Sequence, residues 1–142
     1  MADKFKFELQ DILDFRNFEK EQAENELAKA LAVETEINNK LQNIAQQFIS
    51  VKKQIDLMTS FEEIAAGNTH KKFLDYQKEE LLKQLAEAKL VSEEKRKILA
   101  EIMKKTTALE KLKEKQALAF KEEEDRAEAD MIDDLRSKVR KF

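Results

Sequence analysis

Apolar residues recur along the first part of the chain at the alternating four- and three-residue intervals of a coiled-coil heptad. Counted from Leu9 to Met58, this spacing selects fifteen positions, of which twelve are apolar. The stripe predicts one long helix over about residues 5–58. Its polar members mark places where the contact between helices is loose, specifically paired or open to another partner. The fifteen positions are Leu9, Leu13, Arg16, Lys20, Ala23, Leu27, Ala30, Glu34, Ile37, Leu41, Ile44, Phe48, Val51, Ile55 and Met58.

The second part of the chain shows the same spacing with less regularity. One stripe comprises Leu74, Leu81, Leu85 and Ala88. Ser92 and Lys95 interrupt this stripe, and apolar positions then continue in a shifted register. We interpret the shift as a stutter, which relaxes a supercoil locally, within a second helix over about residues 70–140. The shifted positions are Val91, Ile98, Leu99, Ile102, Leu109 and Leu112.

The chain contains one glycine and no proline. Gly67 is therefore the one strong helix breaker between the two periodic stretches, and it predicts where the chain turns back. Ser60 and Glu63 have the spacing of a capping box, so residues 61–66 are a candidate short turn of helix with Gly67 as its C-cap. We expect the first helix to end near Met58. The predicted fold is all-α, an elongated antiparallel two-helix coiled coil (a helical hairpin) in one domain over residues 1–142, with a turn region at about 59–69.

Folding the chain about Gly67 places residue i beside about residue 134 − i, so that residues after about 130 have no partner. Residues 121–134 carry eight acidic and two basic side chains, and four basic residues follow them. At this same end, several apolar residues lie largely off the heptad stripe and are candidate anchors for a partner. In the alternative interpretation they pack on Met131, Ile132 and Leu135. The off-stripe residues are Phe5, Ile12, Phe15 and Phe18, and the basic ones are Arg136, Lys138, Arg140 and Lys141.

Composition argues against several classes of function. A net charge of −3, from 27 basic and 30 acidic residues, lacks the positive field that nucleic-acid binding requires. There is no cysteine, and His70 is the single histidine, which argues against thiolate chemistry and a multi-histidine metal site. One glycine does not make a phosphate-binding loop. We therefore expect no enzymatic activity, no cofactor and no metal. No apolar run exceeds four residues, so we expect neither a signal peptide nor direct insertion into a membrane, and a cytosolic location by default.

Four segments carry a resemblance to a known family. They are FKFELQDILDFR at 5–16, EQAENELAKA at 21–30, FLDYQ at 73–77 and LEKLKEKQ at 109–116, followed by the acidic residues 122–134. Together they resemble the FliJ family of flagellar export proteins, and the similarity extends over the whole length. Because coiled coils share composition, the aromatic opening and the Tyr-Gln pair after the turn are its more specific parts.

The resemblance implies a central stalk in the flagellar type III export apparatus, similar to the coiled coil of the rotary ATPase gamma subunit. Its implied partners are the hexameric export ATPase, the membrane export gate and export chaperones. The implied location is the cytoplasm, peripherally associated with the inner membrane at the flagellar base.

The resemblance also assigns the candidate contacts to partners. The terminal ends of the two helices would occupy the ATPase ring, and the region near the turn would reach the gate. Tyr76 has an alternative, in which it packs beside the turn near Met58. The candidate ring contacts are Phe5, Ile12, Phe15, Phe18, Glu122, Glu124, Asp125, Arg136 and Arg140, and the candidate gate contacts are Phe73, Tyr76 and Gln77.

Other classes of protein remain open as alternatives. A prefoldin-like chaperone is also a helical hairpin, but residues 59–70 lack the strand pattern it needs. A stalk of a virulence type III secretion system differs only in the family-specific details. A dimeric tether would run as one continuous helix, which Gly67 argues against. A membrane-surface protein would need a basic face, whereas residues 3–16 have a net charge of −1.

Overall fold

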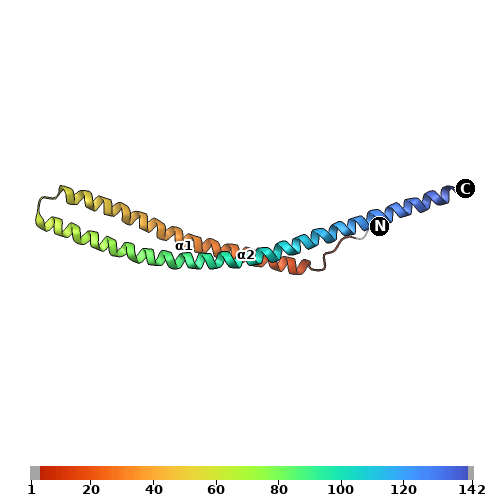
Figure 1. The fold of residues 1–142 in the computed structure, drawn as a ribbon, viewed down its shortest axis with the longest axis horizontal. Helices are drawn as coiled ribbons and strands as arrows, with labels where there is room; N and C mark the ends of the chain where they lie inside the picture. The colour runs from red at the N-terminus through yellow and green to blue at the C-terminus, as the bar shows by residue number, and fades with distance from the viewer. Residues whose placement is uncertain (1–3, 141–142) are drawn as a thin grey trace. The chain divides into compact units, whose positions relative to one another are not determined.

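The computed structural model describes residues 4–140. Two α-helices, α1 (Gln10–Leu57) and α2 (Phe61–Arg140), run antiparallel and are joined by residues 58–60, and the described residues contain no strand (Figure 1). The predicted all-α helical hairpin is confirmed. Three predicted boundaries are wrong: α1 begins at Gln10 instead of residue 5, the loop is confined to 58–60, and α2 begins at Phe61 instead of residue 70.

The two helices contribute to two compact units. We call Ala23–Leu99 the tip unit, because it contains the loop between the helices. The terminal unit consists of the described parts of Met1–Gln22 and Ala100–Phe142.

The heptad stripe, which runs from Leu9 along α1 to Met58, faces α2. Each of its fifteen positions is buried or half-buried, including the polar ones. The core of the tip unit forms around Ile44, Val51 and Leu74. Its cluster is completed by the half-buried side chains of Phe48, Ile55 and Leu81. Burial of such a stripe on both helices is what holds a two-helix structure together, because each helix alone leaves its apolar face in water.

The start of α2 is capped as the capping-box spacing predicts. The backbone N–H of Glu63 donates to Ser60 Oγ at 3.4 Å, and that of Ile64 donates to the Ser60 carbonyl at 3.1 Å. The chain leaves α1 through a tight turn in which the Met58 N–H donates to the Ile55 carbonyl at 3.1 Å. The N-cap satisfies a backbone donor that would otherwise be orphaned, so the helix begins here and not after Gly67.

Gly67 neither ends a helix nor forms the turn. It lies within α2, is buried, and has no positive φ. A Cβ built at Gly67 would lie 2.6 Å from Ile55 Cγ1 and 2.9 Å from Ile55 Cδ1. The missing side chain therefore allows the two helices to approach closely next to the loop. Glycine is needed here for this close approach and not for the backbone freedom that a turn requires.

The stripe of α2 keeps one register through the positions that interrupt it in the sequence. Ser92 and Thr106 are only 2% exposed, while Val91 and Ile98, expected to resume the stripe, are exposed. The predicted stutter at Ser92 is therefore wrong. The seam-facing positions keep the four–three alternation to Lys113, and the next shielded residue is Ala117 instead of residue 116. The register shifts here, within the terminal unit.

Polar seam residues satisfy one another. In the tip unit, the Ser92 hydroxyl lies 3.0 Å from Glu34 Oε1 and 3.1 Å from the Lys89 carbonyl, so its single proton is donated to one of these two acceptors. Lys95 Nζ lies 4.0 Å from Glu26 Oε2. Glu34, a polar position in the heptad stripe of α1, is thus specifically paired with Ser92, the polar position in the stripe of α2. In the terminal unit, Thr106 Oγ1 donates to the Ile102 carbonyl at 2.8 Å.

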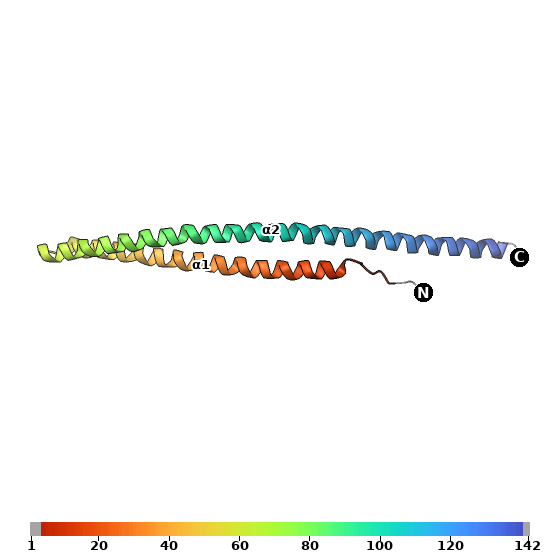
Figure 2. The ribbon, with the colours of Figure 1, turned by 90° about the horizontal axis from the view of Figure 1, so that it is seen from below.

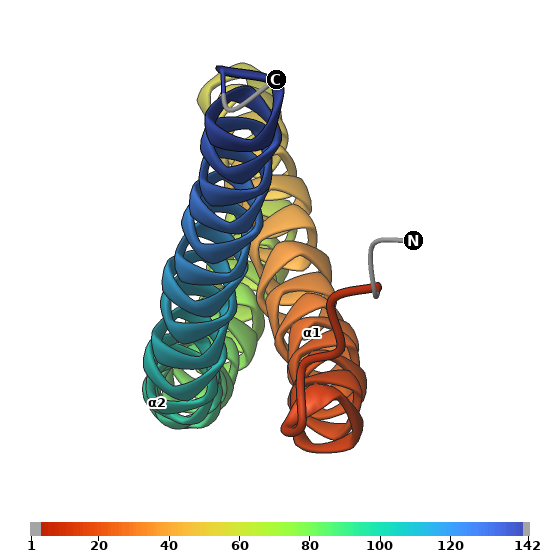
Figure 3. The same cartoon turned by 90° about the vertical axis from the view of Figure 1, so that its right-hand side faces the viewer.

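A non-helical segment, residues 4–9, precedes α1 in the terminal unit (Figure 3). We call it the arm. The Phe5 ring lies 5.7 Å from the Phe120 ring, centroid to centroid, and Phe7 is 7% exposed. Lys113 Nζ donates to Gln10 Oε1 at 2.6 Å, at the start of α1. The arm therefore contacts α2 through Phe5, and it ends in a turn at residues 8–9, where the Gln10 N–H donates to the Phe7 carbonyl at 3.0 Å.

The facing residues define the alignment of the two helices. The pairs Phe5 with Phe120, Gln10 with Lys113, and Glu34 with Ser92 have residue numbers that add up to between 123 and 126, where a turn at Gly67 requires 134. Among residues 4–140, the part of α2 without a facing residue consequently begins soon after 120 and not after 130. Figure 2 shows α2 continuing past the start of α1 in the terminal unit.

Candidate interaction surfaces

Residues 121–140 of α2, which we call the tail, form the first candidate surface. From residue 125 to 140 every residue is exposed. Four large apolar side chains, between 50% and 72% exposed, lie on one face of the helix: two are adjacent, the third follows them by three and four residues, and the fourth follows the third by four. Of the predicted charged contacts, Glu124 is half-buried and the others are exposed; Lys141 lies outside the described residues. The apolar side chains are Met131, Ile132, Leu135 and Val139, and the exposed charged ones are Glu122, Asp125, Arg136 and Arg140.

The second surface lies on α1 in the terminal unit. Phe15 and Phe18 are each 57% exposed, and Ile12 is exposed beside them. The Arg16 guanidinium lies 5.9 Å from the centroid of the Phe15 ring and pairs with Glu19 at 2.9 Å. The alternative interpretation, in which these side chains pack on Met131, Ile132 and Leu135, is not observed because both sets are exposed. Phe5, in contrast, is engaged with Phe120.

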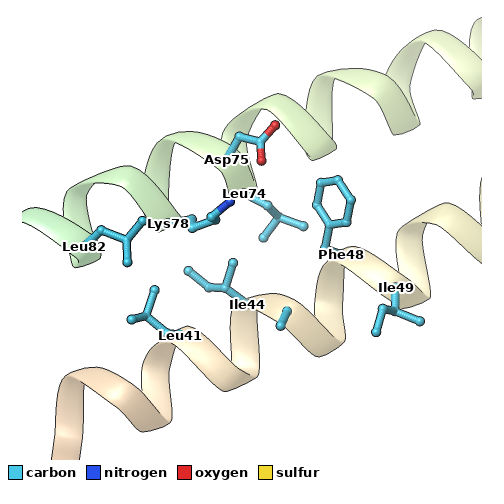
Figure 4. A pocket seen from close by; sticks show the side chains of 9 residues that line it. Leu41, Ile44, Phe48, Ile49, Leu74, Asp75, Lys78 and Leu82 are labelled. Atoms are coloured by element: carbon cyan, nitrogen blue, oxygen red, sulfur yellow. The ribbon is translucent and has the colours of Figure 1, made fainter. Parts of the chain in front are cut away.

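The tip unit carries an apolar groove of about 470 Å³ between the helices (Figure 4). Leu41, Ile44, Phe48 and Ile49 line it from α1, and Leu74 and Leu82 line it from α2. Asp75 and Lys78 contribute the charges at its edge. Such a groove, apolar with a few polar groups, is suited to an apolar side chain or a helix of a partner.

The predicted gate contacts lie outside this groove. Gln77 lines a second, more polar groove of about 340 Å³ together with Lys40, Gln47 and Gln84. Phe73 and Tyr76 line neither groove and are exposed. The alternative for Tyr76, packing beside the turn, is wrong, because that side chain is 63% exposed.

Leu57 and Phe61, which flank the loop, are 83% and 85% exposed. Neither was singled out from the sequence, since each was expected to lie within or next to the turn. The groove residues Ile49 and Leu82 also escaped sequence reasoning, because they lie beside the heptad stripe and not on it. Phe7 was missed as well, although the alternation of Phe5 and Phe7 about Lys6 is a signal for an extended segment.

Residues 4–140 contain no group of three or more histidine, cysteine, aspartate or glutamate side chains placed to hold a metal ion. Within the same range, neither helix has a stretch long and apolar enough to cross a membrane.

The surfaces are therefore those of an α-helical hairpin with exposed apolar side chains in both units. The sequence model of the family described as "Flagellar FliJ protein" matches residues 5–139. The chain belongs to the FliJ family. FliJ proteins are components of the flagellar type III export apparatus and act as structural or escort proteins, not as known enzymes. No curated protein and no solved structure gives a significant match to the chain.

Proposed function

We propose that this FliJ-family chain is the stalk that binds the hexameric flagellar export ATPase through its terminal unit and contacts the membrane export gate through its tip unit. The observation that supports this most strongly is the terminal unit itself. It leaves Phe15 and Phe18 exposed on α1 and an apolar stripe with dense charge exposed on the tail of α2. Aromatic side chains anchor interfaces, and flanking charges steer the encounter.

If the chain binds inside a six-fold ring, it contacts the six subunits unequally. A single pair of helices cannot touch six subunits identically, so it would stabilise different conformations in different subunits. A chain that binds the assembled ring better than free subunits would also favour assembly by mass action. Charged residues of the tail would supply polar contacts, with Ile12, Phe15 and Phe18 as apolar anchors. The charged contacts proposed are Glu122, Glu124, Asp125, Arg136 and Arg140.

The gate contact would use the tip unit. The apolar groove offers a cavity in which a partner side chain can be desolvated. Phe73, Tyr76 and Gln77 would add contacts outside it. Export chaperones are the third proposed class of partner, and the chain would lie at the cytoplasmic side of the inner membrane through these contacts, with no membrane insertion of its own.

The ATPase assignment is tested by the rate of ATP hydrolysis and the hexamer yield of the export ATPase. A variant with Phe15→Ala, Phe18→Ala and Leu135→Ser should lose most of the stimulation given by the parent chain. Leu90→Ser, at an exposed position in the tip unit, is the matched control and should stimulate normally. Equal stimulation by the triple variant and the parent would refute the assignment.

A further inference from the structure

The arm is attached to the rest of the terminal unit through side chains. The Phe5 ring packs on Phe120 at 5.7 Å, and Phe7 is 7% exposed. Lys113 holds the start of α1 by donating to Gln10. Among the described residues, no backbone hydrogen bond joins the arm to α2, so no strand-like ladder fixes it there. The arm can therefore leave α2 in a local opening that breaks no backbone pairing between them.

The start of α1 has no capping side chain. Leu9 occupies the N-cap position, because its carbonyl accepts the Leu13 N–H at 2.9 Å, but its side chain offers no acceptor to the N–H groups of the first turn. Residues 4–9 contain neither glycine nor proline, so α1 can propagate through them without a new nucleus. The helix therefore begins at Gln10 because of the contacts of the arm, chiefly the burial of Phe7, and not because of a local stop signal.

A helical arm would place Phe7 on a different face. With about 100° of rotation per residue, the positions eight and eleven residues after Phe7 lie about 80° and about 20° from it around the helix. These positions are Phe15 and Phe18, each 57% exposed. In the observed arm, Phe7 is buried instead. Two conformations of one segment thus differ in whether Phe7 joins the exposed aromatic face of α1.

We infer that the arm is an autoinhibitory strap of the terminal unit. Attached to α2, it keeps Phe7 away from the face of Phe15 and Phe18; released, it extends α1 and adds Phe7 to that face. A partner that binds all three aromatic side chains favours the released state, because a ligand shifts an equilibrium toward the state that it binds better. The attached arm thus lowers the apparent affinity for this partner. The inference rests on the proposed function only for the identity of the partner, the export ATPase.

Two side chains of α2 can be truncated to release the arm. The release variant carries Lys113→Ala and Phe120→Ala, which remove the contacts of α2 with Gln10 and with the ring of the arm. The matched control carries Lys115→Ala and Leu118→Ala. It changes the same two kinds of residue in the same segment of α2, at exposed positions.

The first measurement is the conformation of the arm, read from the backbone Cα chemical shifts of residues 4–9 in the full chain. The shifts should be non-helical in the parent and in the control, and should move toward helical values in the release variant. The amides of this extension still exchange fast with solvent, because the end of a helix frays. Shifts that stay non-helical in the release variant would overturn the inference.

The second measurement is the affinity for the export ATPase, obtained by calorimetric titration. The release variant should bind roughly threefold more tightly than the parent or better, because the cost of releasing the arm is removed. Adding Phe7→Ala to the release variant should abolish this gain, and the control should bind like the parent. An arm with a purely structural role predicts weaker or unchanged binding by the release variant, and that result would overturn the inference.

The two measurements separate this inference from the ATPase assignment. If the arm becomes helical in the release variant but the triple variant of Phe15, Phe18 and Leu135 stimulates the ATPase like the parent, the strap serves another partner and only the ATPase assignment fails. If the triple variant loses stimulation while the release variant binds the ATPase no more tightly than the parent, the ATPase assignment stands and the strap inference fails.

Discussion

Gly67 packs directly against Ile55 across the antiparallel pair of helices, and a Cβ on Gly67 would lie 2.6 Å from Ile55 Cγ1. The contact lies next to the loop, where α1 and α2 converge. Glycine in a helix interior costs about 1 kcal/mol relative to alanine, and here it allows the two helices to pack closely. The relationship makes the two residues energetically coupled.

Gly67→Ala should therefore destabilise the parent chain, since relieving the overlap with Ile55 costs about 1–3 kcal/mol and exceeds the gain in helix propensity. In an Ile55→Ala background the overlap is absent, and the same substitution should stabilise the chain by about 0.5–1 kcal/mol. Urea unfolding of the four chains in a double-mutant cycle measures the coupling. Additive effects would show that Gly67 has no packing role.

The pair of buried Ser92 and half-buried Glu34 predicts a second stability effect. Ser92→Ala should destabilise by about 1 kcal/mol, because Glu34 loses a hydrogen-bond donor in the seam. Replacing both partners, with Ser92→Ala and Glu34→Leu, should restore at least the parent stability, since two apolar groups then meet. Thermal unfolding monitored by circular dichroism distinguishes these chains. A double variant less stable than Ser92→Ala alone would contradict this account of the seam.

The arm predicts a local effect in the terminal unit. Phe7→Ala should release residues 4–9 from α2 at a cost of about 2–3 kcal/mol in local stability, somewhat below the usual loss for a core phenylalanine because the arm is short. Hydrogen exchange should then speed up at the first turns of α1 and near Lys113 but not around Leu74. Phe15→Ala, at an exposed position of the same unit, is the control and should leave these rates unchanged.

The apolar groove predicts a separation of functions. Ile49→Ser and Leu82→Ser change half-exposed side chains at its edge, so the fold should tolerate both. Together they should weaken binding of the cytoplasmic part of the export gate at least tenfold, while stimulation of the export ATPase stays at the parent level. Calorimetric titration and an ATPase assay give the two values. Loss of ATPase stimulation with intact gate binding would show that the groove contacts the ATPase and not the gate.

The heptad stripe predicted the fold class because burial at intervals of three and four residues is local information. Ser60 and Glu63 likewise predicted a helix start at Phe61, because the cap is a hydrogen bond between residues only three apart. The sequence assigned that start to a separate short turn, however, and placed the start of the second long helix at about residue 70. Gly67 misled because a glycine serves equally for a turn and for close packing. Only the neighbouring helix, through Ile55, decides between them.

The seam of α2 shows a second limit. Ser92 looks like an interruption in a hydropathy pattern, but its partner Glu34 lies 58 residues away in the sequence. Placing the turn at Gly67 also misaligned the two helices. The unpaired region was therefore expected after about residue 130, whereas among the described residues it begins soon after Phe120. The exposure of Phe15 and Phe18 could be predicted from the sequence, because both residues lie off the heptad stripe. The apolar groove of the tip unit could not be predicted in this way, because it depends on the space left between the side chains of two helices.

The central claim, that the terminal unit is the part that enters the export ATPase, is tested most directly by site-specific photocrosslinking to the assembled ATPase. A photoreactive phenylalanine analogue at Phe15, Phe18 or Leu135 should form crosslinks with ATPase subunits, and the same analogue at Phe61 or Leu90 in the tip unit should not. These positions are all exposed, so access of the probe does not bias the comparison. Crosslinks from Phe61 or Leu90, with none from the terminal unit, would contradict the account.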